Sequence, residues 1–269
     1  MGVINTTPDS FSDGGSLYRE ESLDLELVLR RARAMVAGGA SILDVGGEST
    51  RPGAQTVSQQ QELDRVIPCV TAIREEMDVT LSVDTSNADV MREAAAAGAG
   101  IINDVRALTR AGALQAAAEL QLPVVLMHMR GEPGNMQDAP VYEDVVVEVA
   151  AYLEDRAEAC EAAGIAAGNI IIDPGFGFGK TVRHNFELLR GLPQLASLGY
   201  PLLVGLSRKS MIGKLLGRDV DERLAASLSL AVLAAERGAA IIRTHDVRET
   251  SDAVAMLGAL HDIEQMELS

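Results

Sequence analysis

The sequence predicts a single-domain α/β protein folded as a (β/α)8 (TIM) barrel, and three observations support this. The chain is 269 residues long, a length that suits one such barrel. Short apolar runs typical of buried strands alternate eight times with helical patterns, without a sustained pattern of antiparallel hairpins. Polar residues follow nearly every strand, at the end where such barrels carry their sites. We therefore expect residues 1–269 to form one domain.

The eight predicted strands are short, apolar and followed by polar or glycine-rich turns. In chain order they cover residues 1–4, 41–45, 79–83, 101–102, 123–127, 169–172, 201–206 and 239–242. Because strand and helix alternate throughout, these strands are expected to be parallel and to close into a barrel.

The helices between the strands are indicated by amphipathic patterns and by signals at their ends. Long helices are predicted over residues 21–37, 142–163, 221–237 and 249–266. Ser58 and Gln61 have the capping-box spacing at the start of another helix, in which Pro68 predicts a kink or a second start. Ser86 is the expected cap of an alanine-rich helix that ends at Gly98, and a further alanine-rich helix follows the fourth strand.

The composition argues against several classes of protein. Apolar residues make up 47% and charged residues 23% of the chain, which is typical of a globular protein. A formal net charge of -16 argues against a nucleic-acid or anionic-membrane surface. No apolar run reaches the length of a membrane span and no secretory leader opens the sequence, so we expect a cytoplasmic protein. Cys69 and Cys160 are accordingly expected to be reduced thiols.

Polar residues at the strand ends are expected to meet at one mouth of the barrel. They are Asn5, Glu48, Asp84, Asn103, His128, Asp173, Lys209, Arg243 and His245. The carboxylates of Asp84 and Asp173, with the amide of Asn103, match the adjacent N–H donors of a flat heterocycle such as an aminopyrimidinone. The alternative is that these residues cap helices or bond the loop backbone.

Basic residues form a second group at the same mouth. They are Arg51, Arg208, Lys209, Arg243 and His245. Lys209 and Arg243 follow strands seven and eight, the usual phosphate-binding corner of a barrel, which predicts a phosphorylated or diphosphorylated substrate. The alternative is ordinary solvated charge on loops. No Cys/His cluster has zinc spacing, so a metal would be a hard cation on phosphate oxygens, to which Asn5 would add one ligand.

A glycine-rich loop follows the sixth strand. It reads DPGFGFGK over residues 173–180. A P-loop would need glycine where Pro174 stands, and a dinucleotide-binding fingerprint would need glycine where Lys180 stands, so both motifs fail. We expect the glycines to let this loop lie flat beside bound aromatic rings.

Seven motifs together carry a family resemblance. They are NTTPDSFSDGG (5–15), DVGGESTRPG (44–53), SVDT (82–85), IND (102–104), the glycine loop, SRKS (207–210) and RTHD (243–246). In this order they resemble the dihydropteroate synthases of folate biosynthesis, over residues 1 to about 249. The sequence as given begins at the first strand, without the short hairpin that this family usually places before it.

The resemblance implies a barrel transferase that uses Mg²⁺. It would join 4-aminobenzoate to (7,8-dihydropterin-6-yl)methyl diphosphate by dissociative loss of diphosphate. By motif, the catalytic residues would be Asp84, Asp173, Lys209 and Arg243. The pterin diphosphate would contact Thr50, Asp84, Asn103, Met127, Asp173, Lys209, Arg243 and His245. The aminobenzoate would contact Phe11, Thr50, Arg51, Pro52, Phe176 and Ser207, and Asn5 would bind the metal.

The resemblance also implies a homodimer formed through the late helices, and competition by sulfonamides for the aminobenzoate site. Two alternatives stay open at this point. A pterin-dependent methyltransferase on a related barrel would share the contacts of Asp84, Asn103 and Asp173 but would not need the SRKS run. A non-catalytic pterin-binding barrel would not need the diphosphate site at all.

Overall fold

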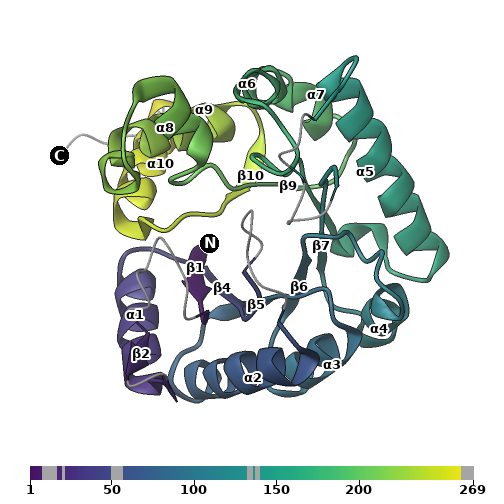
Figure 1. The fold of residues 1–269 in the computed structure, drawn as a ribbon, viewed down its shortest axis with the longest axis vertical. Coiled ribbons are helices and arrows are strands. Elements are labelled where there is room, and N and C mark those ends of the chain that lie inside the picture. Colours follow the sequence, from purple (N-terminus) through teal and green to yellow (C-terminus); the bar gives the residue numbers. More distant parts are fainter. Residues whose placement is uncertain (8–16, 20–21, 50–56, 132–135, 137–139, 262–269) are drawn as a thin grey trace.

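Eight parallel strands form a ring at the centre of the computed structural model, with helices around it (Figure 1). The structure describes residues 1–7, 17–19, 22–49, 57–131, 136 and 140–261. The strands are β1 (Gly2–Asn5), β4 (Ile42–Gly46), β5 (Thr80–Asp84), β6 (Ile101–Asp104), β7 (Val124–Met127), β8 (Ile170–Asp173), β9 (Leu202–Val204) and β10 (Ala239–Ile242).

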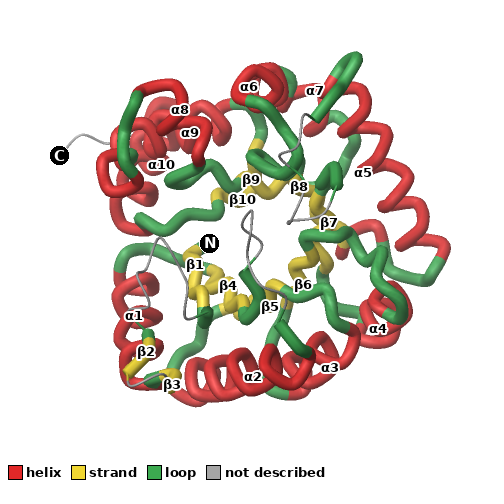
Figure 2. Tube along the Cα trace, viewed as in Figure 1, coloured by secondary structure: helices red, strands yellow, loops and turns green. Residues whose placement is uncertain are grey.

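Each barrel strand pairs with the next along the chain, and the segment after β10 meets β1. Gly2 bridges Thr244 in parallel, and the backbone N–H of Val3 donates to the carbonyl of Thr244 at 3.2 Å. The tube view shows the resulting ring of strands inside a ring of helices (Figure 2). The predicted (β/α)8 architecture is therefore confirmed.

Helices connect consecutive strands around the outside of the ring. The α-helices are α1 (Leu25–Ala37), α2 (Gln59–Glu76), α3 (Ala88–Ala96), α4 (Ala113–Leu120), α5 (Val145–Ala162), α6 (Val182–Arg190), α7 (Leu192–Ala196), α8 (Ser210–Leu216), α9 (Leu224–Glu236) and α10 (Val247–His261). Two short 3₁₀ helices are η1 (Ala167–Asn169) and η2 (Val220–Glu222). The predicted capping box is present, because Ser58 Oγ accepts from the N–H of Gln61 and Gln61 Oε1 accepts from the N–H of Ser58.

Several predicted helix ends were wrong. The first helix begins at Leu25 instead of residue 21, because Asp24 caps it and the antiparallel pair β2 (Tyr18–Arg19) and β3 (Ser22–Leu23) precedes it. Pro68 lies inside one continuous helix, so no second start exists there. The cap of α3 is Asn87, whose Oδ1 accepts from the N–H of Asp89 at 3.1 Å.

The helix predicted over residues 221–237 is divided. Its first turn is the 3₁₀ helix η2, and α9 starts at Leu224.

Cys69 and Cys160 are buried free cysteines, in agreement with the reduced thiols expected from the sequence. No helix in the described ranges is both long and apolar enough to cross a membrane.

The inside of the barrel consists of an apolar layer with a polar layer on top of it. The apolar layer contains Ile101, Val125, Ile171 and Leu203, with Met1, Ile42 and Ile241 packed against them. Side chains alternate across a strand, so residues two positions further on lie on the same inner face. At five of these strands those residues are Asp44, Asn103, Met127, Asp173 and Arg243. The strand period thus places the polar groups at the carboxyl-terminal mouth.

Candidate active site

A cavity of about 590 Å³ opens at the carboxyl ends of the barrel strands. The sequence-predicted residues that line it are Asn5, Asp84, Asn103, Met127, Asp173, Phe176, Ser207, Lys209, Arg243 and His245. Phe11, Thr50, Arg51 and Pro52 lie outside the described residues. In the part of the chain that the structure describes, the barrel therefore brings together every residue predicted to bind a substrate or the metal.

Glu48 and His128, which were also predicted at the polar mouth, make contacts with other side chains of the protein. Glu48 reaches the cavity rim, where its carboxylate lies 3.3 Å from Nη1 of Arg106. His128 is buried, and its Nδ1 lies 2.9 Å from Nζ of Lys180. The expectation that His128 faces the mouth is wrong, since the glycine loop after β8 turns Lys180 towards it and the pair packs together beneath the loop.

Asp44 is the centre of the acidic wall, and the sequence reasoning did not select it. Its side chain is fully buried, and its Oδ2 accepts from Nε of Arg243 at 2.7 Å and from Nδ2 of Asn103 at 3.1 Å. Nη2 of Arg243 also donates to Oδ2 of Asp84 at 3.2 Å. The available signal was a carboxylate inside an apolar strand, two residues after Ile42 on the inner face.

The acidic wall, defined here as Asp44, Asp84, Asn103 and Asp173, holds carboxylates at high electrostatic cost. Burial, together with the negative charge of Asp44, raises the pKa of Asp84 to about 8, against the opposing effect of Arg243. Burial also raises the pKa of Asp173, although the N–H of Gly175 donates to its Oδ1 at 2.7 Å. A ligand that donates N–H groups to these carboxylates would stabilise their charged forms.

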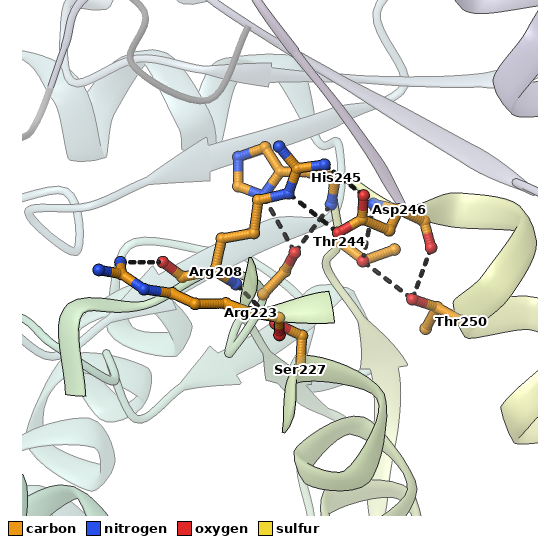
Figure 3. A network of polar contacts seen from close by, with 8 residues as sticks. Arg208, Arg223, Ser227, Thr244, His245, Asp246 and Thr250 are labelled. Carbon is orange, nitrogen blue, oxygen red and sulfur yellow. Dashed lines mark hydrogen bonds and ion pairs between the residues drawn. The ribbon is translucent and has the colours of Figure 1, made fainter. Parts of the chain in front are cut away.

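The basic corner is defined here as Ser207–Lys209 after β9 and Arg243–Asp246 after β10. Arg208, Thr244, His245 and Asp246 of this corner belong to a network of polar contacts (Figure 3). Both carboxylate oxygens of Asp246 accept from the guanidinium of Arg208, with Nε to Oδ2 at 3.0 Å. Ser207 Oγ accepts from the backbone N–H of His245 at 3.2 Å and lies 3.1 Å from Nδ1 of that ring. These contacts tie the two loops to each other.

Arg208 adopts a left-handed backbone conformation with φ of 57°, which is unfavourable for a residue with a side chain. Hydrogen bonds to both its backbone N–H and its carbonyl hold Arg208 in that conformation. The N–H of Arg208 donates to Oγ of Ser227 at 3.0 Å, and Nη1 of Arg223 donates to the carbonyl of Arg208 at 3.1 Å (Figure 3). The sequence placed Arg208 among anion-binding residues, whereas the structure uses its guanidinium to bind Asp246.

His245 is another residue of this corner that lines the cavity. Burial and the positive charges of Arg243, Arg208 and Lys209 lower its pKa to about 3, so the ring is neutral at pH 7. Ser207 was predicted to contact the aminobenzoate, and its Oγ lies 3.1 Å from Nδ1 of this ring. A neutral imidazole can donate from one nitrogen to a ligand while the other nitrogen bonds Ser207.

Phe178 is an aromatic residue of the cavity lining that was not among the predicted contacts, whereas Phe176 was. Both rings line the cavity, but Phe176 is only 1% exposed, whereas Phe178 is half-buried. Nζ of Lys209 lies 4.4 Å from the centroid of the Phe178 ring. Sequence gave no means of choosing between them, because the two rings alternate with glycines in the same loop.

Comparison with known proteins agrees with this geometry. The sequence pattern of the family described as "Pterin binding enzyme" matches residues 1–245. The dihydropteroate synthase of Escherichia coli K12 is 53% identical over 259 residues, which cover 96% of this chain and 90% of that protein.

Solved structures are similar over the same length. The Yersinia pestis dihydropteroate synthase in a sulfonamide drug complex matches with a TM-score of 0.94 at 50% identity, covering 97% of this chain and 94% of the other. The Xanthomonas albilineans dihydropteroate synthase with 4-aminobenzoic acid matches with a TM-score of 0.89 at 49% identity, covering 97% and 92%.

Proposed function

Because the chain belongs to the dihydropteroate synthase family of pterin-binding enzymes, we propose that its barrel cavity joins (7,8-dihydropterin-6-yl)methyl diphosphate to 4-aminobenzoate. The products are 7,8-dihydropteroate and diphosphate. The observation that carries the residue assignments is the meeting of the acidic wall and the basic corner around one cavity.

The acidic wall binds the pterin in this proposal. Asp84 and Asp173 accept hydrogen bonds from the ring N–H and amino groups, and the Asn103 amide adds a polar contact beside them. Met127 lies on the same inner face and provides an apolar contact for the flat ring. Support comes from the raised pKa of Asp84, because a carboxylate short of donors gains most from a ligand rich in N–H groups.

The basic corner binds the diphosphate. Lys209 and Arg243 provide positive charge, and His245 donates as a neutral imidazole. Arg243 bonds Asp44 and Asp84 on one side and lines the cavity on the other, so it lies between the pterin and the leaving group.

These positions support a dissociative substitution. The bond between the methylene carbon and the diphosphate oxygen breaks first, and its electron pair leaves with diphosphate. The positive charge left on the methylene carbon is shared with the pterin ring, where the carboxylates of Asp84 and Asp173 stabilise it. The neutral amine of 4-aminobenzoate then forms the C–N bond and loses a proton, so no strong general base is required.

Mg²⁺ is part of the proposal, held by Asn5. In the described part of the chain no three His, Cys, Asp or Glu side chains could form a metal cage. Asn5 lines the cavity, and its side-chain oxygen would suit a hard cation whose other ligands would be water and phosphate oxygens of the substrate. When bound, Mg²⁺ would neutralise charge on the departing diphosphate.

The aromatic amine lies against Phe178 and Phe176 in this proposal. Phe11, Thr50, Arg51 and Pro52 stay predicted contacts from the motifs. Sulfonamides are expected to compete for this subsite, in line with the sulfonamide complex of the Yersinia pestis relative.

A homodimer through the last helices is also proposed. Leu233 on α9, and Met256 and Leu260 on α10, are exposed apolar side chains, at 37%, 71% and 65%. Replacement of Met256 and Leu260 with serine should shift the protein towards monomer in sedimentation velocity. An unchanged sedimentation coefficient would place any dimer contact elsewhere.

The proposed activity is tested with the purified protein, the dihydropterin diphosphate, Mg²⁺ and labelled 4-aminobenzoate. Labelled dihydropteroate should form with one diphosphate released for each product. A methyltransferase or a non-catalytic pterin-binding barrel would bind the pterin but release no diphosphate, so a folded protein that gives no product rejects the proposal.

A further inference from the structure

Lys180, at the end of the glycine loop, is a buried ammonium group that the mechanism above does not use. Its side chain is 3% exposed. Nζ donates to the carbonyl of Gly175 at 2.9 Å and to that of Phe178 at 3.0 Å, and lies 2.9 Å from Nδ1 of His128. Lys180 is not one of the residues lining the cavity. Its contacts are to the loop itself and to the segment after β7.

The donors of Lys180 match the acceptors around it. A protonated amine has three N–H groups, and three acceptors lie within 3.0 Å. Burial and the charge of Lys180 lower the pKa of His128 to about 2, so its ring is neutral. Because an ammonium group can only donate, the tautomer that fits this contact has Nδ1 as the acceptor and the hydrogen on Nε2. Burial lowers the pKa of the Lys180 amine to about 7, so all three donors are present below that pH.

Backbone contact between two loops explains why the motif needs glycine. Gly175 and Gly179 have φ of 68° and 61°. A Cβ at Gly175 would lie 1.9 Å from the carbonyl oxygen of His128, and one at Gly179 would lie 2.3 Å from that of Arg130. The loop after β8 therefore lies directly on the backbone after β7, and Lys180 bonds both segments.

The glycine loop carries two groups of the cavity. Asp173 ends β8 and is fixed by strand pairing with Met127, while its Oδ1 accepts from the N–H of Gly175. Phe178 lies beyond the strand, in the loop, where its carbonyl is bound by Lys180 and its ring faces Lys209. Release of the ammonium contacts would therefore displace Phe178 more than Asp173.

We propose that Lys180 is a positioning residue that fixes the glycine loop, and that it supports binding of the aromatic amine more than binding of the pterin. The identity of these two ligands rests on the proposed function. The loop geometry does not, because it follows from contacts within the chain.

The test compares Lys180→Met with Arg183→Met, a matched change three residues later, at pH 6. Arg183 is 86% exposed and pairs only with the carboxylate of Glu187 on its own helix among the described ion pairs. Amide hydrogen exchange in residues 175–179 should become faster in Lys180→Met and stay unchanged in Arg183→Met. Because a misplacement of about 1 Å can cost up to ~100-fold, KM for 4-aminobenzoate should rise about tenfold or more, and KM for the pterin diphosphate less than about threefold.

The possible results test the inference about the glycine loop separately from the proposed function. Unchanged exchange in Lys180→Met overturns the inference, whatever the activity. A KM increase that is equal for both substrates, or larger for the pterin, also overturns it, because Lys180 would then act through the charge of Asp173. If the wild type forms no dihydropteroate, the proposed function fails and hydrogen exchange still tests the loop contact.

A second variant covers failure of Lys180→Met to fold. His128→Leu removes one of the three acceptors and leaves both carbonyls in place. It should show the same pattern of exchange and KM values with smaller changes. Wild-type exchange in a folded His128→Leu protein would count against the inference.

Discussion

The acidic wall and the basic corner face the same cavity but are built by different means. The wall residues lie on strand positions, where barrel register fixes them over the apolar layer. The corner residues lie in loops, where hydrogen bonds fix them. Examples are the bonds of Arg208 with Asp246 (Figure 3) and of Ser207 with His245. Arg243 links the two, because it directly follows β10 and bonds two wall carboxylates.

This difference separates the expected consequences of substitution. A change in the wall alters charge and pKa while the strands keep the geometry. A change in the corner alters geometry, because the strained loop at Arg208 is held by its bonds. The two regions should therefore respond differently in stability, in pH dependence and in KM.

Arg243→Met should have the largest effect, because it damages both regions. Removing one partner of a buried ion pair costs about 3–5 kcal/mol, and here Asp44 is fully buried. Loss of the charge beside the leaving group should lower kcat/KM by ~1000-fold or more. Urea denaturation and steady-state kinetics measure the two effects. Near-wild-type stability would show that Asp44 is neutralised in some other way.

Asp84→Asn should separate activity from stability. The amide keeps the shape but removes the charge beside the forming cation, so kcat/KM should fall by ~100-fold or more. At pH 7 the free energy of unfolding should change by less than about 1 kcal/mol, because Asp84 with its pKa near 8 is then mostly protonated. A large loss of stability with full activity would reverse the assigned roles of the wall.

The pH dependence of the same pair of proteins gives a further test. Since the folded pKa of Asp84 is raised from 3.8 to about 8, its contribution to stability is full below pH 3.8 and is lost as pH rises through 8. Activity that needs the carboxylate should rise over the upper part of that range. The Asp84→Asn protein should show a smaller decline in stability and lack this rise in kcat/KM. A rise that persists in the variant must come from another group.

Asp246→Asn should have the smallest effect, and it should be confined to the corner. Arg208 and Asp246 are partly exposed, at 24% and 13%, so the loss of stability should be about 1 kcal/mol or less. The loosened turn at Lys209 should raise KM for the pterin diphosphate about tenfold, with KM for 4-aminobenzoate unchanged. Asp155→Asn, on the exposed surface of α5, is a matched control. Equal changes in both KM values would mean that the corner supports the whole cavity.

The acidic wall is more predictable from the sequence than the basic corner. Asp84 and Asp173 end buried strands, and Asn103 is the last residue but one of another. The period of two along a strand is a local property that determines which face they share. Asp44 was not predicted as a site residue, because it lies two residues before the end of β4. Its position two residues after Ile42 nevertheless follows the same rule.

The corner depended on contacts between distant segments. Arg208 with Asp246 spans 38 residues, and nothing in the local sequence distinguishes an arginine that binds an anion from one that bonds a carboxylate. Ser86 shows the same limit, because its hydroxyl bonds Asp104 at the end of the neighbouring strand β6 instead of capping α3, which Asn87 does.

By itself, then, the sequence determined the alternation of strands and helices, the closure into a barrel and the polar composition of its mouth, since these follow from local periodicity. Only the tertiary structure decided which polar groups face the cavity and which bond each other. It turned Phe178 towards Lys209, used Lys180 to hold the glycine loop, and placed Arg243 between Asp44 and Asp84. A side chain's partner is set by the whole packed fold, and that information is not contained in spacing along the chain.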